Sequence, residues 1–445
     1  MYMRATVLVS ECIIYIPAIV IFLRRYTRMQ AVHTWSASIA LVAILLQPAT
    51  ILIDHGHFQY NTVMLGLVVA SLDAVLAGRV LWACVFFVGA LGFKQMALYY
   101  SPVMFAFLLG VCVFPRIRIL RLLAISLVTL VALASLFAPF MVAATKKDAQ
   151  STFLSLPLPP LMQRIPIQLD KRSIVFAPIF QFTQIIHRVF PFSRGIFEDK
   201  VANAWCAVHT FYKLNRFPLD FLQKVSLGAT LTSLVIPCAI IFRHPHSSNL
   251  LLTLSSVSWG FFLFSFQVHE KSVLLPLLPM TLLLADDGGL SKEIRAWVGW
   301  ANMLGSWTLF PLLKREGLRI PYFVMTLLWA YLLGLPPTSM QTYYTRSGAS
   351  DSSSNEKEKG FEPHILSKLI HLAFYAAMIT WHILEAFVPA PSGKPDLWVV
   401  ANALVGASGF GVVYLWCLYR LIVQSRKVDQ RLMKGSGKRS SEVMG

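Results

Sequence analysis

Long apolar segments recur from one end of the chain to the other, and they dominate the sequence. We identify thirteen candidate membrane-spanning helices, several of them short enough to be re-entrant: 7–23, 35–53, 60–77, 79–94, 98–114, 119–143, 220–242, 248–267, 271–285, 293–313, 321–336, 366–388 and 397–424. A helix crosses a bilayer with about 20 apolar residues. Only 13% of the 445 residues are charged, against about 25% in soluble domains. The sequence therefore predicts an all-α polytopic membrane protein with about 11–13 transmembrane helices.

The basic loops between these segments predict an orientation. If each segment crosses once, four Lys/Arg clusters share one side: 24–28, 115–121, 243–246 and 425–440. The positive-inside rule places this side in the cytosol, with the N-terminus lumenal and the C-terminus cytosolic. One cluster, KREGLR at 314–319, falls on the other side and makes the count weakest in the last third. Lipid head groups account for the net charge of +18 more simply than nucleic acid does.

The predicted organisation has six regions. A polar, Ser-rich stretch at 345–360 is typical of a disordered cytosolic connector. The regions are N-terminal membrane helices (1–143), a long lumenal loop with interfacial helices (144–219), central membrane helices (220–336), the connector (337–365), a C-terminal helix pair (366–424) and a basic cytosolic tail (425–445).

A dense polar motif, DHGHFQYN at 54–61, separates two apolar segments on the predicted lumenal side. Its polar side chains are Asp54, His55, His57, Gln59 and Asn61. Taken alone, the motif is explained equally well by a helix end at the membrane–water interface and by a functional site. A metal is the weaker functional reading, because no third ligand lies near the two histidines. Donors and acceptors in this density suit a sugar or a phosphate better.

A second motif on the same side is QVHEK at 267–271. If a helix opens at Lys271, the backbone N–H groups and the helix dipole favour an anion there, and His269 and Lys271 would bind a phosphate. An interfacial turn with a snorkelling lysine explains the same spacing equally well. Lys94 and Gln95, in a strongly apolar stretch, form another candidate, since an intramembrane lysine is a functional hypothesis by default.

A basic and aromatic stretch lies in the long loop at 188–206. Arg188, Arg194 and Lys200 alternate there with aromatic residues. This pattern favours an amphipathic segment lying at the membrane interface. A binding site for an anionic lipid substrate is the less favoured interpretation.

Together, these motifs resemble one family. The matching stretches, in order, are MRATVLVSECIIYIPA (3–18), QPATILIDHGHFQYN (47–61), LGFKQMALYYSP (91–102), RVFPFSRGIFEDKVANAWC (188–206) and FQVHEKSVLLPLLP (266–279). They are similar to the α-1,3-glucosyltransferases of the endoplasmic reticulum that use dolichyl-phosphate glucose, which are multi-spanning enzymes of the GT-C type. The resemblance covers most of the chain to about residue 285 and weakens beyond it. Gly56 resembles the member that adds the first glucose.

The resemblance implies transfer of glucose from dolichyl phosphate to a terminal mannose of dolichyl-pyrophosphate-linked oligosaccharide, in assembly of the N-glycan precursor. The reaction is expected to invert a β-linked donor into an α-1,3 product without metal or cofactor, at the lumenal face of the membrane. Cations and hydrogen bonds that stabilise the leaving phosphate matter most. The implied phosphate- or substrate-binding residues are His269 first, then Lys271, Arg194 and Lys94, with Asp54, His57 and Gln59 shaping the site.

The family's proposed base is an aspartate in the first lumenal loop, after an additional N-terminal helix. The chain begins at Met1, partway through the motif that follows this loop, so the resemblance places the base upstream of Met1. We therefore expect Met1 to be an internal methionine, and the chain to be a fragment or truncated gene model that lacks catalytic competence. Neither Asp54 nor Glu11 is expected to replace the base.

Two alternatives to this function remain open. One is the relative that adds the second glucose, and the other is a non-catalytic lipid-binding or transporter-like protein. Symmetric repeats with broken helices would indicate a transporter, and we find none in the sequence.

Overall fold

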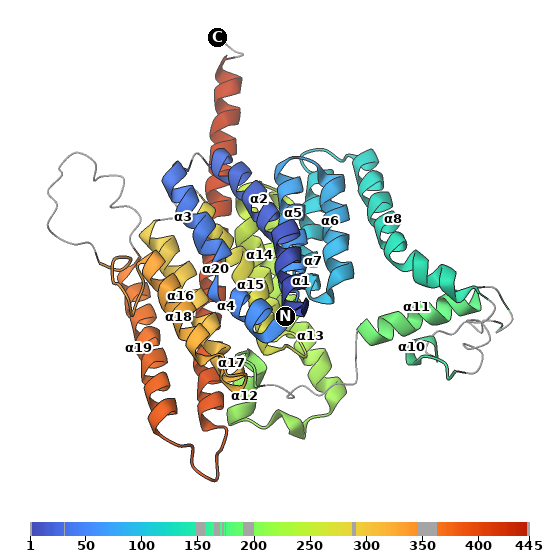
Figure 1. The fold of residues 1–445 in the computed structure, drawn as a ribbon. Helices are drawn as coiled ribbons and strands as arrows, with labels where there is room; N and C mark the ends of the chain where they lie inside the picture. Colours follow the sequence, from blue (N-terminus) through green and yellow to red (C-terminus); the bar gives the residue numbers. More distant parts are fainter. Residues whose placement is uncertain are drawn as a thin grey trace.

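The computed structural model is a bundle of helices with no strand among the residues it describes (Figure 1). These residues are 2–30, 32–146, 156–163, 170, 173, 175–189, 200–286, 291–344 and 363–442. Met1 and the predicted connector at 345–360 lie outside them. The predicted all-α class is confirmed.

The first third of the chain supplies α1 to α8. Its elements are α1 (Tyr2–Ser10), η1 (Glu11–Tyr15), α2 (Ile16–Met29), α3 (Thr34–Leu45), α4 (Pro48–Ile51), η2 (Leu52–Phe58), α5 (Asn61–Leu76), α6 (Val80–Phe93), η3 (Gln95–Tyr100), α7 (Ser101–Val113) and α8 (Ile119–Ala144). Helix α8 leads to α10 (Pro160–Gln163) and α11 (Phe176–Val189), which lie apart from the main bundle in Figure 1.

The rest of the chain closes the bundle. Its elements are α12 (Ala204–Phe211), η4 (Leu214–Arg216), α13 (Leu219–Arg243), α14 (Ser247–Phe264), η5 (Glu270–Val273), α15 (Leu274–Leu282), η6 (Leu283–Ala285), α16 (Lys292–Thr308), α17 (Phe310–Arg315), α18 (Arg319–Leu333), α19 (Ile365–Phe387) and α20 (Leu397–Glu442).

Every one of the thirteen predicted segments is helical. In the described part of the chain, eight helices are long and apolar enough to cross a membrane, and α5, α6 and α18 are shorter apolar helices. The predicted segments 271–285 and 293–313 are broken. The first consists of η5, α15 and η6, and the second is interrupted between α16 and α17. A polytopic membrane protein is what these lengths and compositions indicate.

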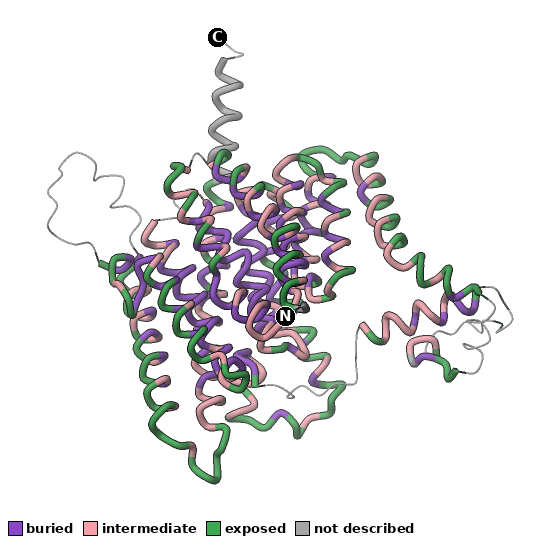
Figure 2. The backbone as a smooth tube through the Cα atoms, viewed as in Figure 1, coloured by how far each residue is buried: buried purple, intermediate pink, exposed green. Residues whose placement is uncertain are grey.

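Burial separates the central helices from those that face lipid (Figure 2). In α14, 78% of the most apolar window is buried inside the protein, whereas in α8 the share is 6%. A helix that is apolar all round is buried in a large core or faces lipid. At the centre, Trp259 of α14 stacks on Phe410 of α20, with ring centroids 4.7 Å apart.

A break between α3 and α4 positions the DHGHFQYN motif. Pro48 cannot donate a backbone hydrogen bond, so it favours the start of a new helix over the continuation of α3. The break is anchored from α16, because Gln47 Nε2 donates to Asn302 Oδ1 at 2.8 Å. Asn302 Nδ2 is also 3.0 Å from Thr281 Oγ1 of α15. These buried amides fix the point from which η2 extends.

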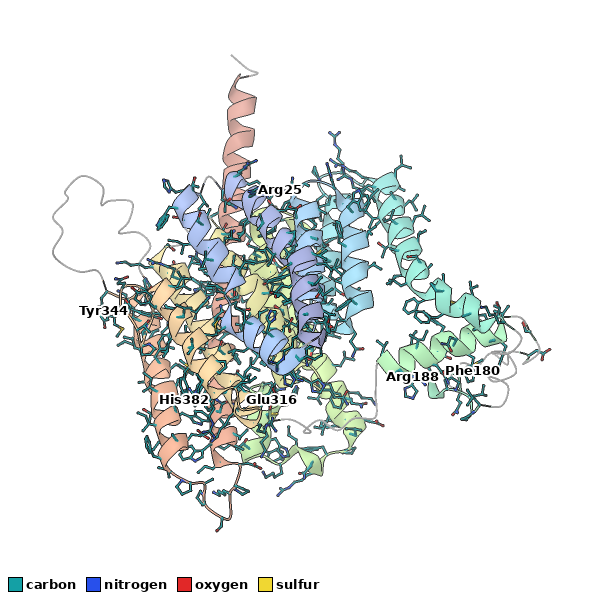
Figure 3. All side chains as sticks on the ribbon, viewed as in Figure 1. Arg25, Phe180, Arg188, Glu316, Tyr344 and His382 are labelled. Atoms are coloured by element: carbon teal, nitrogen blue, oxygen red, sulfur yellow. The ribbon has the colours of Figure 1, made fainter. Side chains whose placement is uncertain are left out.

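The basic clusters gather at one end of the bundle. The ring of Phe114 packs edge-on against Phe242, with centroids 5.3 Å apart, and Gln424 Nε2 donates to Ser248 O at 2.9 Å. Arg25 lies at this end and Glu316 at the other (Figure 3). The sequence-based count therefore sorted these clusters correctly. The assignment of their end to the cytosol stays a prediction, as do the boundaries of the six regions.

Candidate functional site

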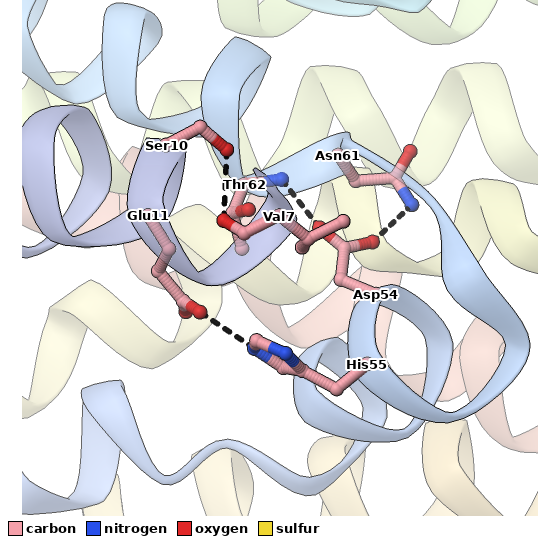
Figure 4. Close-up of polar contacts among 7 residues, drawn as sticks. All are labelled: Val7, Ser10, Glu11, Asp54, His55, Asn61 and Thr62. Atoms are coloured by element: carbon pink, nitrogen blue, oxygen red, sulfur yellow. Dashed lines mark hydrogen bonds and ion pairs between the residues drawn. The ribbon is translucent and has the colours of Figure 1, made fainter. Parts of the chain in front are cut away.

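Asp54 folds the first motif back on itself. Its side chain is fully buried. Oδ1 accepts a hydrogen bond from Asn61 Nδ2 at 2.7 Å, and Oδ2 accepts one from the backbone N–H of Thr62 at 2.6 Å (Figure 4). The first turn of a helix has unpaired N–H groups and a partial positive charge. Asp54 therefore caps α5 and closes the loop that carries His57 and Gln59.

Both motifs contain a residue with left-handed backbone. Phe58 has φ 72° and Gln267 has φ 59°, and they are the only non-glycine residues with positive φ in the described chain. Such a conformation costs of order 1–3 kcal/mol and occurs preferentially at functional sites. Here it turns the chain after His57 and before His269, so that the two motifs face the same end of the bundle.

The two histidines of the first motif bind different carboxylates. His55 Nε2 lies 2.6 Å from Glu11 Oε2 of η1 (Figure 4), and His57 Nδ1 contacts Glu316 Oε1 after α17. Within the described ranges, no three His, Cys, Asp or Glu side chains gather where they could hold a metal ion. The pairing explains why Glu11, an acid in a first apolar helix, is tolerated: it ties η1 to η2.

His57 links the two motifs. Lys271 Nζ lies 2.8 Å from His57 Nε2, while Nδ1 of the same ring contacts Glu316. An ammonium group donates and cannot accept, so Nε2 accepts and the ring proton sits on Nδ1, where it donates to the carboxylate. The hydrogen bonds therefore run in one direction, from Lys271 to His57 and from His57 to Glu316, and they fix the position of the Lys271 ammonium group.

Lys94 brings a second ammonium group to the same loop. Its Nζ donates to Gln59 Oε1 at 3.1 Å and to Asn61 Oδ1 at 2.5 Å. Lys94 is partly buried, and its ammonium group interacts electrostatically with Asp54 and with Lys271. Two ammonium groups near enough to repel one another, in a partly desolvated site, form an environment that an anion would stabilise.

The other predicted site residues lie in three places. His269 is exposed and begins the turn that carries Lys271. Arg194 lies outside the described residues. Arg188, on α11, lies to one side of the main bundle, apart from Glu316 (Figure 3), while Lys200 forms an ion pair with Asp396. The structure thus brings together Asp54, His57, Gln59, Lys94 and Lys271, and their roles stay predictions.

The catalytic base expected upstream of Met1 is not among these side chains. Met1 itself lies outside the described residues, which begin at Tyr2 in α1. Two nearby acids already have partners, because Asp54 accepts from Asn61 and Thr62 and Glu11 binds His55. The expectation that neither acid replaces the base stays a prediction. The identity of the base and the expected truncation at Met1 stay predictions.

Glu316 is a site residue that the sequence did not reveal. It belongs to KREGLR, the cluster that disagreed with the charge count. At this end of the bundle Arg315 lies 3.7 Å from Glu270, and Glu316 holds His57. The position of this cluster on the side opposite the other basic clusters could have revealed Glu316. Charged residues on the same side as the polar motifs are able to pair with them.

Gly56 allows the first motif to approach this cluster. A Cβ atom there would lie 2.9 Å from Leu318 Cδ1, which follows Glu316 by two residues. The close approach keeps His57 within reach of Glu316. A larger side chain at position 56 would have to displace Leu318 or the turn after α17.

Comparison with known proteins agrees with this arrangement. The ALG6, ALG8 glycosyltransferase family matches the chain over residues 1–157 and 169–419. The chain belongs to this family. The family match extends past residue 285, where the resemblance of the motifs weakens.

Named relatives of this glycosyltransferase span most of its length. A Schizosaccharomyces pombe protein named "Probable dolichyl pyrophosphate Man9GlcNAc2 alpha-1,3-glucosyltransferase" is 37% identical over 433 residues, covering 97% of this chain and 74% of that protein. A Saccharomyces cerevisiae protein with that name, without "Probable", is 39% identical over 96% of this chain and 73% of its own length. The corresponding Mus musculus protein is 31% identical over 95% and 76%. The predicted family is confirmed.

Proposed function

We propose that the enzyme represented by this chain transfers glucose from dolichyl-phosphate glucose to the terminal mannose of Man9GlcNAc2 carried on dolichyl pyrophosphate, forming an α-1,3 linkage. The relatives in S. pombe, S. cerevisiae and mouse carry this acceptor and linkage in their names. The observation that supports the donor half is the placement of Lys94 and Lys271 around one loop, with Lys271 held by His57. This acceptor is that of the first glucose, so it is preferred over the second-glucose alternative.

The two lysines suit a reaction with a phosphate leaving group. As the bond between the anomeric carbon and the phosphate oxygen breaks, negative charge grows on the phosphate, and fixed cations stabilise it most when they need no reorganisation. Lys271 is fixed in this way by His57 and Glu316. In the proposal, Lys271, Lys94 and the exposed His269 bind the phosphate.

In the proposal, the acceptor hydroxyl attacks the anomeric carbon on the face opposite the phosphate, with inversion, and passes its proton to the aspartate base that the family resemblance implies. We do not assign this role to Asp54, because both of its oxygens accept hydrogen bonds within the loop. Glu11 is likewise engaged by His55. We propose no metal for this step, since Lys94 and Lys271 already supply the cationic groups.

The proposed reaction takes place at the lumenal surface of the endoplasmic reticulum. The basic clusters and the polar motifs occupy opposite ends of the bundle (Figure 3). If the positive-inside rule holds, the end with Arg25 faces the cytosol and the end with Glu316 faces the lumen. The C-terminal tail is then cytosolic.

Disruption of the gene in its own organism tests the function directly. Lipid-linked oligosaccharides from the disrupted strain are expected to stop at Man9GlcNAc2 without glucose, and a wild-type copy of the gene restores glucosylation. A Lys271→Ala copy is expected to restore it poorly, and a Glu293→Gln copy fully. Accumulation of an oligosaccharide with one glucose would instead assign the second step. Unchanged glucosylation after disruption would refute the proposal.

A further inference from the structure

A cavity lies beside the candidate phosphate site. It has a volume of about 540 Å³ and lies between α17, the C-terminal end of α19 and the first turn of α20. Pockets that bind small ligands measure about 300–1,000 Å³. Six charged side chains line it: Lys200, Glu270, Lys314, Arg315, Glu385 and Asp396.

The six charges are arranged as three pairs. Lys314 contacts Glu385, Lys200 contacts Asp396, and Arg315 lies 3.7 Å from Glu270. The side chains of Glu385 and Glu270 are only 13% and 14% exposed. Because every cation is balanced by a carboxylate, the cavity offers no net positive charge to an anion. Because six charges line it, an apolar ligand would desolvate them without compensation.

A neutral ligand rich in hydroxyl groups fits this lining. Carboxylates accept hydrogen bonds while lysine and arginine donate them, and a sugar hydroxyl does both. Two indole rings complete the wall. Trp381 Nε1 donates to Trp398 O at 2.8 Å, and Trp398 Nε1 donates to Val388 O at 2.9 Å. These bonds fix the rings, and a rigid aromatic surface packs well against the C–H face of a sugar.

The cavity shares two backbone segments with the candidate phosphate site. Glu270 lines the cavity and the next residue, Lys271, contacts His57. Arg315 lines the cavity and the next residue, Glu316, contacts the same histidine. A ligand in the cavity therefore lies beside the place where a donor phosphate would bind.

We propose that this cavity binds the mannose arm of the oligosaccharide acceptor, next to the donor. The inference rests on the proposed function for the identity of the glycan. It gives a substrate-binding role to the C-terminal helix pair α19 and α20, beyond the motifs found in the sequence. Glu385 and Asp396 accept hydrogen bonds from sugar hydroxyls, and the ring of Trp398, held in place by the buried Trp381, supports a pyranose face.

Binding of free Man9GlcNAc2 oligosaccharide to the purified chain of residues 1–445 tests the proposal without requiring turnover. Glu385→Gln and Asp396→Asn keep the shape of each side chain and remove its charge. Each is expected to raise the Kd by about tenfold, the effect of losing a hydrogen bond to a charged group. Glu293→Gln is the matched control, because Glu293 pairs with Arg420 at 3.4 Å outside the cavity and its loss is expected to change the Kd less than twofold.

The possible outcomes distinguish failure of the cavity proposal from failure of the proposed glucosyltransferase function. Unchanged Kd values for both cavity variants would overturn this inference and leave the glucosyltransferase proposal intact. Competition by inorganic phosphate at the cavity would also overturn it, because an anion site would then be present. Loss of oligosaccharide binding in the variants, combined with normal glucosylation in the gene-disrupted strain, would instead keep the cavity as a glycan site and refute the proposed function.

Discussion

Lys271 Nζ lies 2.8 Å from His57 Nε2, although the two residues are 214 positions apart in the chain. The contact joins the QVHEK turn to the DHGHFQYN loop, and Glu316 holds the other nitrogen of the ring. From the sequence, Lys271 could equally have been a phosphate ligand or a snorkelling lysine at the interface. In the structure its position is fixed by His57, which Glu316 orients from a third segment.

The three residues should act as one unit on the donor. Lys271→Ala is expected to weaken binding of dolichyl-phosphate glucose by ~10–100-fold, because it removes a charge-assisted hydrogen bond to phosphate. Glu316→Gln should cause a smaller loss, since it only releases the imidazole. In the Lys271→Ala background, Glu316→Gln should cost little more. Donor titrations of the single and double variants measure this coupling, and additive losses would contradict it.

Donor affinity should depend on the protonation of Lys94. Its ammonium group donates to Gln59 and Asn61 at the candidate phosphate site, and this cation is lost when the amine deprotonates at alkaline pH. Titrations between about pH 6 and pH 10 should show affinity falling at the alkaline end. Lys94→Arg should abolish that fall, because arginine stays charged to about pH 12 and above. An identical alkaline fall in the arginine variant would exclude Lys94 as its cause.

Asp54 should matter first for folding. In Asp54→Asn, an amide N–H₂ group would face donors at Asn61 and Thr62, leaving buried hydrogen-bonding groups unpaired at a cost of about 1–3 kcal/mol. The apparent unfolding temperature in detergent should fall by several degrees. Asp73→Asn is the control, because Asp73 pairs with Arg25, whose side chain is 40% exposed, and such pairs contribute about 0–1 kcal/mol. Equal melting of both variants would rule out the capping role.

Gly110 should be essential for the packing of α7 on α13. A Cβ atom there would lie 2.4 Å from the backbone oxygen of Phe242, and backbone cannot move aside as a flexible side chain can. Small residues allow membrane helices to approach closely, so Gly110→Ala should destabilise the protein by about 1–3 kcal/mol. At Gly228 of α13 a Cβ would meet nothing within 4 Å, so Gly228→Ala should be neutral. Detergent melting curves compare the two directly.

Much of the fold could be predicted from hydropathy because backbone groups in a bilayer must be satisfied within each segment. All thirteen predicted segments are helical for this reason. The breaks at 283–285 and at Leu309 were harder to foresee. They depend on neighbours such as Asn302, whose hydrogen bonds join segments that are far apart in the chain.

The sequence by itself determined the class of the protein, the sorting of basic loops to one end, and the motifs that carry the polar chemistry. Each of these depends on the composition of a short segment and its solvation by lipid or water. Only the tertiary structure decided which partners those polar groups take. Three pairs show this: Glu11 with His55, Glu316 with His57, and Arg315 with Glu270. Their members are 44 to 259 positions apart in the chain. Helix packing brings such residues together, and the spacing of residues within a short segment does not predict which distant residue each will contact.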